Sequence, residues 1–284
     1  MRNFSYMPEP TQEVKYTEFD GGEPALHRGP LALETALEVV VNGRSHSLLM
    51  QTPGREKELV TGYLYTEGLI ETPAEIGEMR FAPGPEFLGA EGLRVEVTLP
   101  GLNDAAGLPA RPAVALASCG LCGKEALDQL GRGLNRVRSR QRFAWSVLFG
   151  LLPDLRRHQP LYEKTRGVHA VALYRADGTF FCCFEDVGRH NALDKVIGHG
   201  LLSGWSFEDK LMVLSGRASL EMVLKTARSQ APLLLCFSSP TALAVDAAKA
   251  LNLTLVGRQE ERTLAGFTHT RRLVGESPGE VPEL

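Results

Sequence analysis

Residues 210–256 read KLMVLSGRASLEMVLKTARSQAPLLLCFSSPTALAVDAAKALNLTLV and contain three apolar runs that alternate with two segments of helical apolar spacing. In chain order these pieces are 210–214, 219–229, 232–237, 241–251 and 253–256. Short apolar runs bounded by turn residues are typical of buried strands. Because this order joins parallel strands through crossover helices, the sequence predicts a layered α/β domain.

Two loops of this segment connect the end of a predicted strand to the start of a predicted helix. Ligands of such sheets bind outside the carboxyl ends of the strands, where free amides at helix starts attract anions. Ser239 is expected to cap the second helix, with Pro240 in its first turn. Ordinary turns and caps remain the alternative interpretation. The candidate anion-binding residues are Ser215, Gly216, Arg217, Ser238 and Ser239.

A dense polar string follows a second pair of apolar runs. The runs at 169–174 and 179–185 flank Asp177-Gly178, which favours a tight hairpin turn. The polar residues after them are more numerous than a solvated turn needs, and they follow a strand end directly. We therefore expect them to line a ligand cavity at the same edge of the sheet. The candidates are His169, Asp186, Arg189, His190, Asn191 and Lys195.

Cys119 and Cys122 form a C-x-x-C pair among glycines, between an apolar run at 113–117 and a helix-like segment at 124–134. At a helix start, backbone N–H groups and the helix dipole stabilise a thiolate. Dithiol redox exchange, half of a tetrahedral zinc site and carriage of a persulfide sulfur all fit such a pair. A zinc site would draw its other ligands from His169, His190, Cys182 or Cys183.

The first half of the chain predicts a smaller α+β unit. Two β-prone runs flank Asn42-Gly43, a strong hairpin signal, and Thr52-Pro53 introduces a helix before strands near 79–81 and 93–99. Residues 1–32 show no sustained period. The expected organisation is a tail at 1–32, a small α+β domain at 33–112, the cysteine loop with its connecting helix at 113–140, the α/β domain at 141–273 and a tail at 274–284.

Composition narrows the function classes. The chain has 284 residues, of which 43% are apolar and 23% charged, and its net charge of -3 argues against general nucleic-acid binding. No apolar run approaches the roughly 18 residues that cross a membrane, and the first residues are polar, so a cytoplasmic protein is expected. Five cysteines in such a chain favour catalytic or metal chemistry over a disulfide framework.

Five arginines and no acidic residue occur within 132–142. Such a run is usually a solvated face, and an anion-attracting surface is the alternative.

The chain resembles the FdhD/NarQ family of formate dehydrogenase accessory sulfurtransferases over about 37–273. The resemblance is carried by SCGLCG at 118–123, RGVH at 166–169, EDVGRHNALDK at 185–195, SGR at 215–217 with EMVLK at 221–225, and PTALAV at 240–245. The second of these stands where the family has T-G-G-x-H, with Arg166 in place of the first glycine. The long polar string is the most specific of these motifs.

The resemblance implies a sulfur carrier. Such a protein takes sulfur from a cysteine desulfurase as a persulfide, here on Cys119 with Cys122 beside it. It passes the sulfur to the bis(molybdopterin guanine dinucleotide) molybdenum cofactor that formate dehydrogenase receives. The resemblance also implies a homodimer and a cytidine-deaminase-like C-terminal domain without the deaminase zinc site. A zinc-binding scaffold and a dithiol oxidoreductase are the alternatives that the cysteine pair leaves open.

The family's cofactor-binding segment corresponds here to Arg258, Gln259, Glu260, Glu261, Arg262 and Thr263. This sequence departs from the family's usual basic, glycine-containing run because two glutamates follow Gln259. The segment follows the strand predicted at 253–256, so we expect it to close over the same edge of the sheet. The two arginines are expected to face the ligand and the two glutamates to face water. GDP is the expected surrogate ligand, and Arg217→Ala is expected to lower its affinity roughly ten- to a hundredfold.

Overall fold

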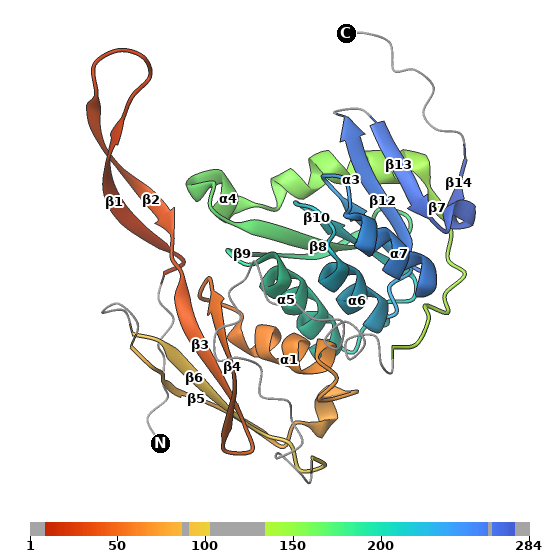
Figure 1. The fold of residues 1–284 in the computed structure, drawn as a ribbon, viewed down its shortest axis with the longest axis horizontal. Helices are drawn as coiled ribbons and strands as arrows, with labels where there is room; N and C mark the ends of the chain where they lie inside the picture. Colours follow the sequence, from red (N-terminus) through yellow and green to blue (C-terminus); the bar gives the residue numbers. More distant parts are fainter. Residues whose placement is uncertain (1–8, 87–90, 103–133, 261–262, 276–284) are drawn as a thin grey trace.

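The computed structural model describes residues 9–86, 91–102, 134–260 and 263–275. Cys119, Cys122 and the segments predicted on either side of them lie outside the described residues. The described chain folds into two layered units, and a narrow hairpin projects from them (Figure 1). The sequence predicts an α/β class, and the structure is a mixed α/β fold with several sheets.

The N-terminal unit is a four-stranded sheet with a helix packed on one face. Its strand order is β4-β3-β6-β5. Asn42 and Gly43 have φ angles of 47° and 79°, so the predicted hairpin turn is confirmed. Leu59, Val60 and Leu64 of the helix are fully buried against the sheet. The elements are β3 (Thr35–Val41), β4 (Arg44–Gln51), α1 (Glu56–Thr66), the short helix η1 (Pro73–Glu75), β5 (Glu78–Pro83) and β6 (Leu93–Thr98).

The C-terminal unit is built on a six-stranded sheet of order β13-β12-β11-β10-β8-β9. Strands β10, β11 and β12 are parallel, as predicted, and β8 and β13 run antiparallel to their neighbours. The strands are β8 (His169–Arg175), β9 (Phe180–Asp186), β10 (Lys210–Leu214), β11 (Leu233–Cys236), β12 (Thr254–Glu260) and β13 (Thr263–Thr268). The helices are α3 (Trp145–Arg157), α4 (Pro160–Thr165), α5 (Arg189–Leu202), α6 (Leu220–Arg228) and α7 (Ala242–Ala250).

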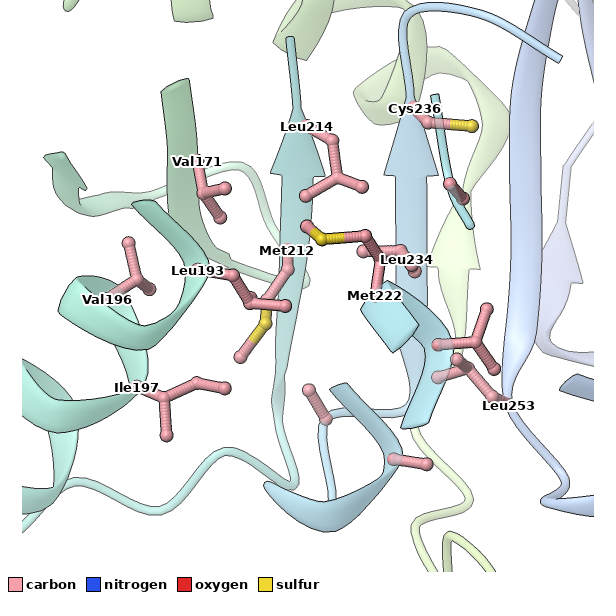
Figure 2. Close-up of a cluster of buried hydrophobic side chains, with 14 of the residues drawn as sticks. Val171, Leu193, Val196, Ile197, Met212, Leu214, Met222, Leu234, Cys236 and Leu253 are labelled. Atoms are coloured by element: carbon pink, nitrogen blue, oxygen red, sulfur yellow. The ribbon is translucent and has the colours of Figure 1, made fainter. Parts of the chain in front are cut away.

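Both faces of this sheet are buried, which explains its near-continuous apolar strands. Along β10, Met212 and Leu214 face α5, α6 and α7, and Figure 2 shows them beside Leu193 and Met222. The alternate residues Leu211 and Val213 face α3. Three layers follow from this alternation, with the sheet in the middle.

Helices α1 and α5 join the two units (Figure 1). They cross where Gly62 of α1 meets the Asp194 carbonyl and where Gly198 of α5 meets the Glu58 carbonyl. A Cβ at either glycine would overlap that backbone. Only glycine therefore permits this close approach.

The N-terminal region departs from the expected tail. Residues 11–32 form an antiparallel hairpin of β1 (Thr11–Glu18) and β2 (Ala25–Ala32), which projects beside α4 (Figure 1). Most of its residues are exposed on both faces. Without a buried face the strands carry no apolar alternation, so residues 11–32 show no periodic pattern that would predict them.

Three further expectations need correction. Thr241, rather than Ser239, caps α7, and its hydroxyl accepts the Ala244 amide at 3.3 Å. Residues 258–260 continue β12 and pair with β13, so they are strand rather than a closing loop. Val137 is buried in the core of the C-terminal unit, so that unit already includes residues before 141.

Short strands at the two ends of this unit also pair in parallel, β7 (Phe143–Ala144) with β14 (Leu273–Val274), next to the short helix η3 (Thr270–Arg272). Among the described residues, no helix is both long and apolar enough to cross a membrane.

Candidate anion-binding site

A cavity of about 350 Å³ opens at the carboxyl edge of the parallel strands. Ser215 directly follows β10, Phe237 directly follows β11, and His169 begins the antiparallel neighbour β8. This is the edge at which ligands of open α/β sheets bind. The lining residues are Arg156, Gln159, Tyr162, Arg166, Gly167, Val168, His169, Ser215 and Phe237.

Three arginines surround the two aromatic rings of the cavity. The guanidinium carbon of Arg156 lies 5.4 Å from the Tyr162 ring centre, and that of Arg166 lies 5.3 Å from the same centre. Arg258 stands over Phe237 at 5.2 Å. Within the described residues, none of the three forms an ion pair with a carboxylate. The site thus holds unneutralised positive charge beside flat apolar surfaces, which suits an anion that carries an aromatic ring.

Helix α4 sets the position of the arginine pair on Tyr162. The Glu185 carboxylate of β9 accepts the Leu161 and Tyr162 amides at 2.9 and 2.7 Å and so fixes the first turn of α4. Arg166 ends α4 in the left-handed conformation, with φ of 56°. The chain turns there, and the Arg166 side chain lies over the ring one helical turn earlier.

His169 and the loop after β10 form the floor of the cavity. A Cβ at Gly216 would lie 3.4 Å from His169 Nδ1, so this glycine lets the loop pass close to the ring. Ser215 Oγ accepts the Ala170 amide at 2.8 Å, which leaves its proton free to donate. Burial, aided by Arg189, lowers the pKa of His169, so this ring is neutral at pH 7.

His190 lies in a second polar group near His169, at the starts of α5 and α6. Its Nε2 lies 3.3 Å from Glu221 Oε2. Burial lowers the pKa of His190 to about 4, although Glu221 opposes that shift. Arg189 also contributes to this environment, and its Nε is buried without a hydrogen-bond partner among the described residues. The structure thus brings His169, Arg189 and His190 together.

Asp186, Asn191 and Lys195 are placed differently from what the sequence suggested. Asp186 is fully buried, and its carboxylate pairs with Lys195 at 2.7 Å. It accepts the Thr52 amide at 3.1 Å, and Lys195 donates to the Thr52 carbonyl at 2.8 Å. Asn191 donates to the Met50 carbonyl at 2.8 Å. These residues tie α5 to the N-terminal unit, and none of them lines the cavity.

A second buried pair starts at the neighbouring position of α5, because Asp194 directly precedes Lys195. Lys225 of α6 donates to the Asp194 carboxylate at 2.8 Å and to Thr66 Oγ1 of α1 at 2.7 Å. Thr66 also donates to Asp194 at 2.9 Å. The joint between the two units is therefore made of buried ionic groups that satisfy one another.

The remaining predicted residues lie at or beyond the rim. Arg217 is exposed, and Ser239 accepts a hydrogen bond from Gln259 at 3.1 Å. The Ser238 carbonyl accepts the Cys236 thiol at 2.8 Å. Glu260 and Thr263 are exposed strand residues, so of this segment Arg258 alone among the described residues stands over a cavity ring. Glu261 and Arg262 lie outside the described residues.

The described cysteines are poor nucleophiles. Burial raises the pKa of Cys182 to about 12 and that of Cys236 to about 11, and it also raises the pKa of Cys183. A thiolate, not a thiol, attacks sulfur. The candidates for sulfur chemistry therefore remain Cys119 and Cys122. In the described part of the chain, no group of three or more His, Cys, Asp or Glu side chains is placed to hold a metal.

Sequence reasoning missed the contribution of α3 and α4 to the cavity. Leu148, Leu152 and Leu155 have helical spacing and could have indicated α3. Arg156, Tyr162 and Arg166 have no such signal, because only the packing of α3 against the sheet brings them to this edge.

The chain is similar to proteins of one family. A model of the FdhD/NarQ family matches residues 32–274. A sulfur carrier protein FdhD from Mycolicibacterium paratuberculosis is 35% identical, over 93% of this chain and 98% of the relative. The proteins of the same name from Nocardia farcinica and Saccharolobus solfataricus are 36% and 33% identical, and they cover 88% and 86% of this chain and 90% and 88% of the relatives.

The fold has a solved counterpart. The crystal structure of a protein from Desulfotalea psychrophila, assigned as a formate dehydrogenase accessory protein, superposes with a TM-score of 0.73 and 25% identity. The superposition covers 94% of this chain and 100% of that one.

Proposed function

Because the chain belongs to the FdhD/NarQ family, we propose that it is a sulfur carrier that serves formate dehydrogenase. It takes sulfur from a cysteine desulfurase as a persulfide on Cys119 and delivers it to the bis(molybdopterin guanine dinucleotide) molybdenum cofactor. The observation that carries the proposal is the family match together with a cavity whose arginines form no ion pair with the described carboxylates. A carrier of this kind needs a reactive thiol and a place for an anionic, nucleotide-bearing substrate.

Loading is a thiol exchange. The Cys119 thiolate attacks the terminal sulfur of the donor persulfide, a new sulfur–sulfur bond forms, and the donor cysteine leaves as a thiolate. One sulfur atom moves, and no electrons are gained or lost overall. Burial raises the pKa of Cys182, Cys183 and Cys236, which makes them poor attacking thiols and supports the choice of Cys119.

Release requires two electrons, because the transferred sulfur must leave as sulfide. We assign these electrons to Cys122, whose thiolate attacks the Cys119 sulfur, expels hydrosulfide toward the substrate and leaves a disulfide between the two cysteines. A dithiol reductant of the cell then restores both thiols. The C-x-x-C spacing suits such a pair.

The cavity binds one guanine nucleotide end of the substrate. Its volume of about 350 Å³ is at the small end of ligand sites, so it suits part of this large cofactor rather than all of it. Tyr162 and Phe237 offer surfaces for the base, and Arg156, Arg166 and Arg258 offer donors to the phosphates. His169 and Ser215 add neutral hydrogen-bonding groups on the floor.

Three finer features belong to the same proposal. The C-terminal unit is cytidine-deaminase-like, supported by its helix-crossed parallel strands, and the protein acts in the cytoplasm as a homodimer. GDP is the surrogate ligand for binding studies.

The test is the intact mass of the protein after incubation with a cysteine desulfurase and cysteine. Wild type is expected to gain one sulfur atom, mapped to Cys119 by peptide analysis, and Cys119→Ala is expected to gain none. Cys183→Ser is the matched control and should load normally. Cys122→Ala should load but release sulfur slowly. Loading of Cys119→Ala, or stoichiometric zinc held by the pair, would contradict the proposal.

A further inference from the structure

The segment 136–142 presents four arginines on one face. Val137 is buried in the core of the C-terminal unit, and Ser139 and Gln141 are half-buried. The intervening side chains alternate outward, as they do along an extended chain. Those exposed residues are Arg136, Arg138, Arg140 and Arg142, which are called the arginine stripe below.

The inward side of the stripe is firmly anchored. The Val137 amide donates to the Leu251 carbonyl at 2.9 Å, and Asn252 donates to the Val137 carbonyl at 2.7 Å. Buried Arg272 donates twice to the Ser139 carbonyl, at 3.1 and 2.9 Å. The backbone is thus fixed before any partner arrives, which lowers the entropic cost of binding.

The stripe is not neutralised within the described chain. None of its four arginines forms an ion pair there, although exposed arginines elsewhere, such as Arg80 with Glu78 at 2.6 Å, do so. Alternate residues of an extended chain lie roughly 6.5–7 Å apart, so four like charges repel one another. An acidic partner would relieve that repulsion.

The neighbouring surface favours a protein over a nucleic acid. A hollow of about 570 Å³ beside the stripe is lined by Arg138, Arg140 and Lys210 and also by Glu208 and Asp209, and the Asp209 carboxylate pairs with Lys210 at 2.7 Å. The surface beside the stripe therefore carries both signs of charge, which a protein surface can match and a continuous phosphate backbone cannot. The net charge of -3 also disfavours a polyanion.

We propose that the arginine stripe docks an acidic face of the sulfur-donor protein. This inference rests on the proposed function. The stripe lies near Leu251 and Lys210, at the amino ends of the parallel strands, whereas the cavity lies at their carboxyl ends. A donor bound at the stripe therefore leaves the cavity open for the acceptor. Cys122 is also only 14 positions before Arg136 in the chain.

The experiment compares two variants of the full chain with equal charge change. The stripe variant replaces Arg136, Arg138, Arg140 and Arg142 by Gln, and the control replaces the exposed Arg28, Arg44, Lys57 and Arg80 by Gln. Sulfur transfer from a cysteine desulfurase is measured over a range of salt concentrations. A fluorescent peptide of alternating Glu and Thr is titrated in parallel, with its Lys-Thr counterpart and a short oligothymidylate for comparison.

The stripe variant is expected to lower kcat/KM for the donor by about tenfold or more at low salt, with the difference fading at high salt and kcat unchanged. The affinity of the stripe variant for the acidic peptide should also fall, whereas the control variant should bind the peptide as wild type does. Equal behaviour of both variants, or tighter binding of oligothymidylate than of the peptide, would overturn the inference. If wild type accepts no sulfur, the proposed function fails, and the peptide titration still decides the stripe.

Discussion

The joint between the two units and the cavity at the carboxyl edge are both rich in charged side chains, but their partners differ. In the joint, Asp186 and Lys195 are buried and satisfy each other and Thr52. In the cavity, Arg156 and Arg166 face aromatic rings and no carboxylate of the described chain. Charged side chains that are paired with each other stabilise the fold, whereas charged side chains without a counter-charge are available to a ligand. The predictions below test that division.

The largest expected effect is at the joint. Lys195→Met leaves the buried Asp186 carboxylate without its cation, which should lower the free energy of unfolding by about 3–5 kcal/mol. Arg80→Met breaks an exposed ion pair and should leave the unfolding midpoint unchanged. Urea denaturation of both variants makes the comparison. Equal midpoints would show that the joint is not a stabilising element.

The glycine crossing gives a second test of the joint. Gly62→Ala forces α1 away from the Asp194 carbonyl and should cost about 1–3 kcal/mol or more. Gly150→Ala is the control, because a Cβ there meets nothing within 4 Å and alanine favours helix at this exposed position of α3. Thermal melts should therefore shift down for the first variant and not for the second. An unchanged melt of Gly62→Ala would contradict the close packing.

His190 makes the stability of the folded protein depend on pH. Its folded pKa of about 4 lies below the usual value of about 6.5, so the unfolded chain binds more protons between these values. Stability should thus fall as pH drops, by on the order of 2 kcal/mol from pH 7 to pH 5 for this group. His190→Gln should reduce that loss, while His27→Gln, on the exposed hairpin, should keep it. Urea denaturation of wild type and both variants at pH 7 and pH 5 measures this loss. An equal loss in wild type and His190→Gln would contradict the prediction.

The sequence predicted the parts of the fold whose signals are local. The apolar runs of β10, β11 and β12 and the turn at Asn42-Gly43 are properties of adjacent residues, and these predictions are confirmed. The β1–β2 hairpin was missed because it buries no face.

The site was less predictable because its contacts are distant in the chain. Asp186 belongs to the joint because of Thr52, a partner 134 positions earlier. No pattern within residues 185–195 distinguishes a residue that lines a cavity from one that joins two units. The roles of Arg156 and Arg166 could likewise not be predicted from the sequence. They depend on the packing of α3 and α4, which places the two guanidinium groups over Phe237 and Tyr162.

The smallest expected effect concerns Arg217. The sequence alone predicted a ten- to hundredfold loss of GDP affinity for Arg217→Ala. Because Arg217 does not line the cavity, in contrast to Arg156 and Arg166, it is expected to act on the ligand only as a nearby exposed charge. Exposed charge pairs contribute about 0–1 kcal/mol, so the geometry predicts a loss of less than about fivefold. Calorimetry with GDP distinguishes the two. A tenfold loss would extend the site to the loop after β10.

The most direct test of the central claim is a calorimetric titration of GDP into wild type and into the double variant Arg156→Gln, Arg166→Gln. Each lost charge-assisted hydrogen bond contributes about 1.5–3 kcal/mol, so the double variant should bind at least about tenfold more weakly. A control with Arg28→Gln and Arg80→Gln should match wild type. No GDP binding by wild type, or equal affinity of the double variant, would contradict the assignment of the cavity as the nucleotide site.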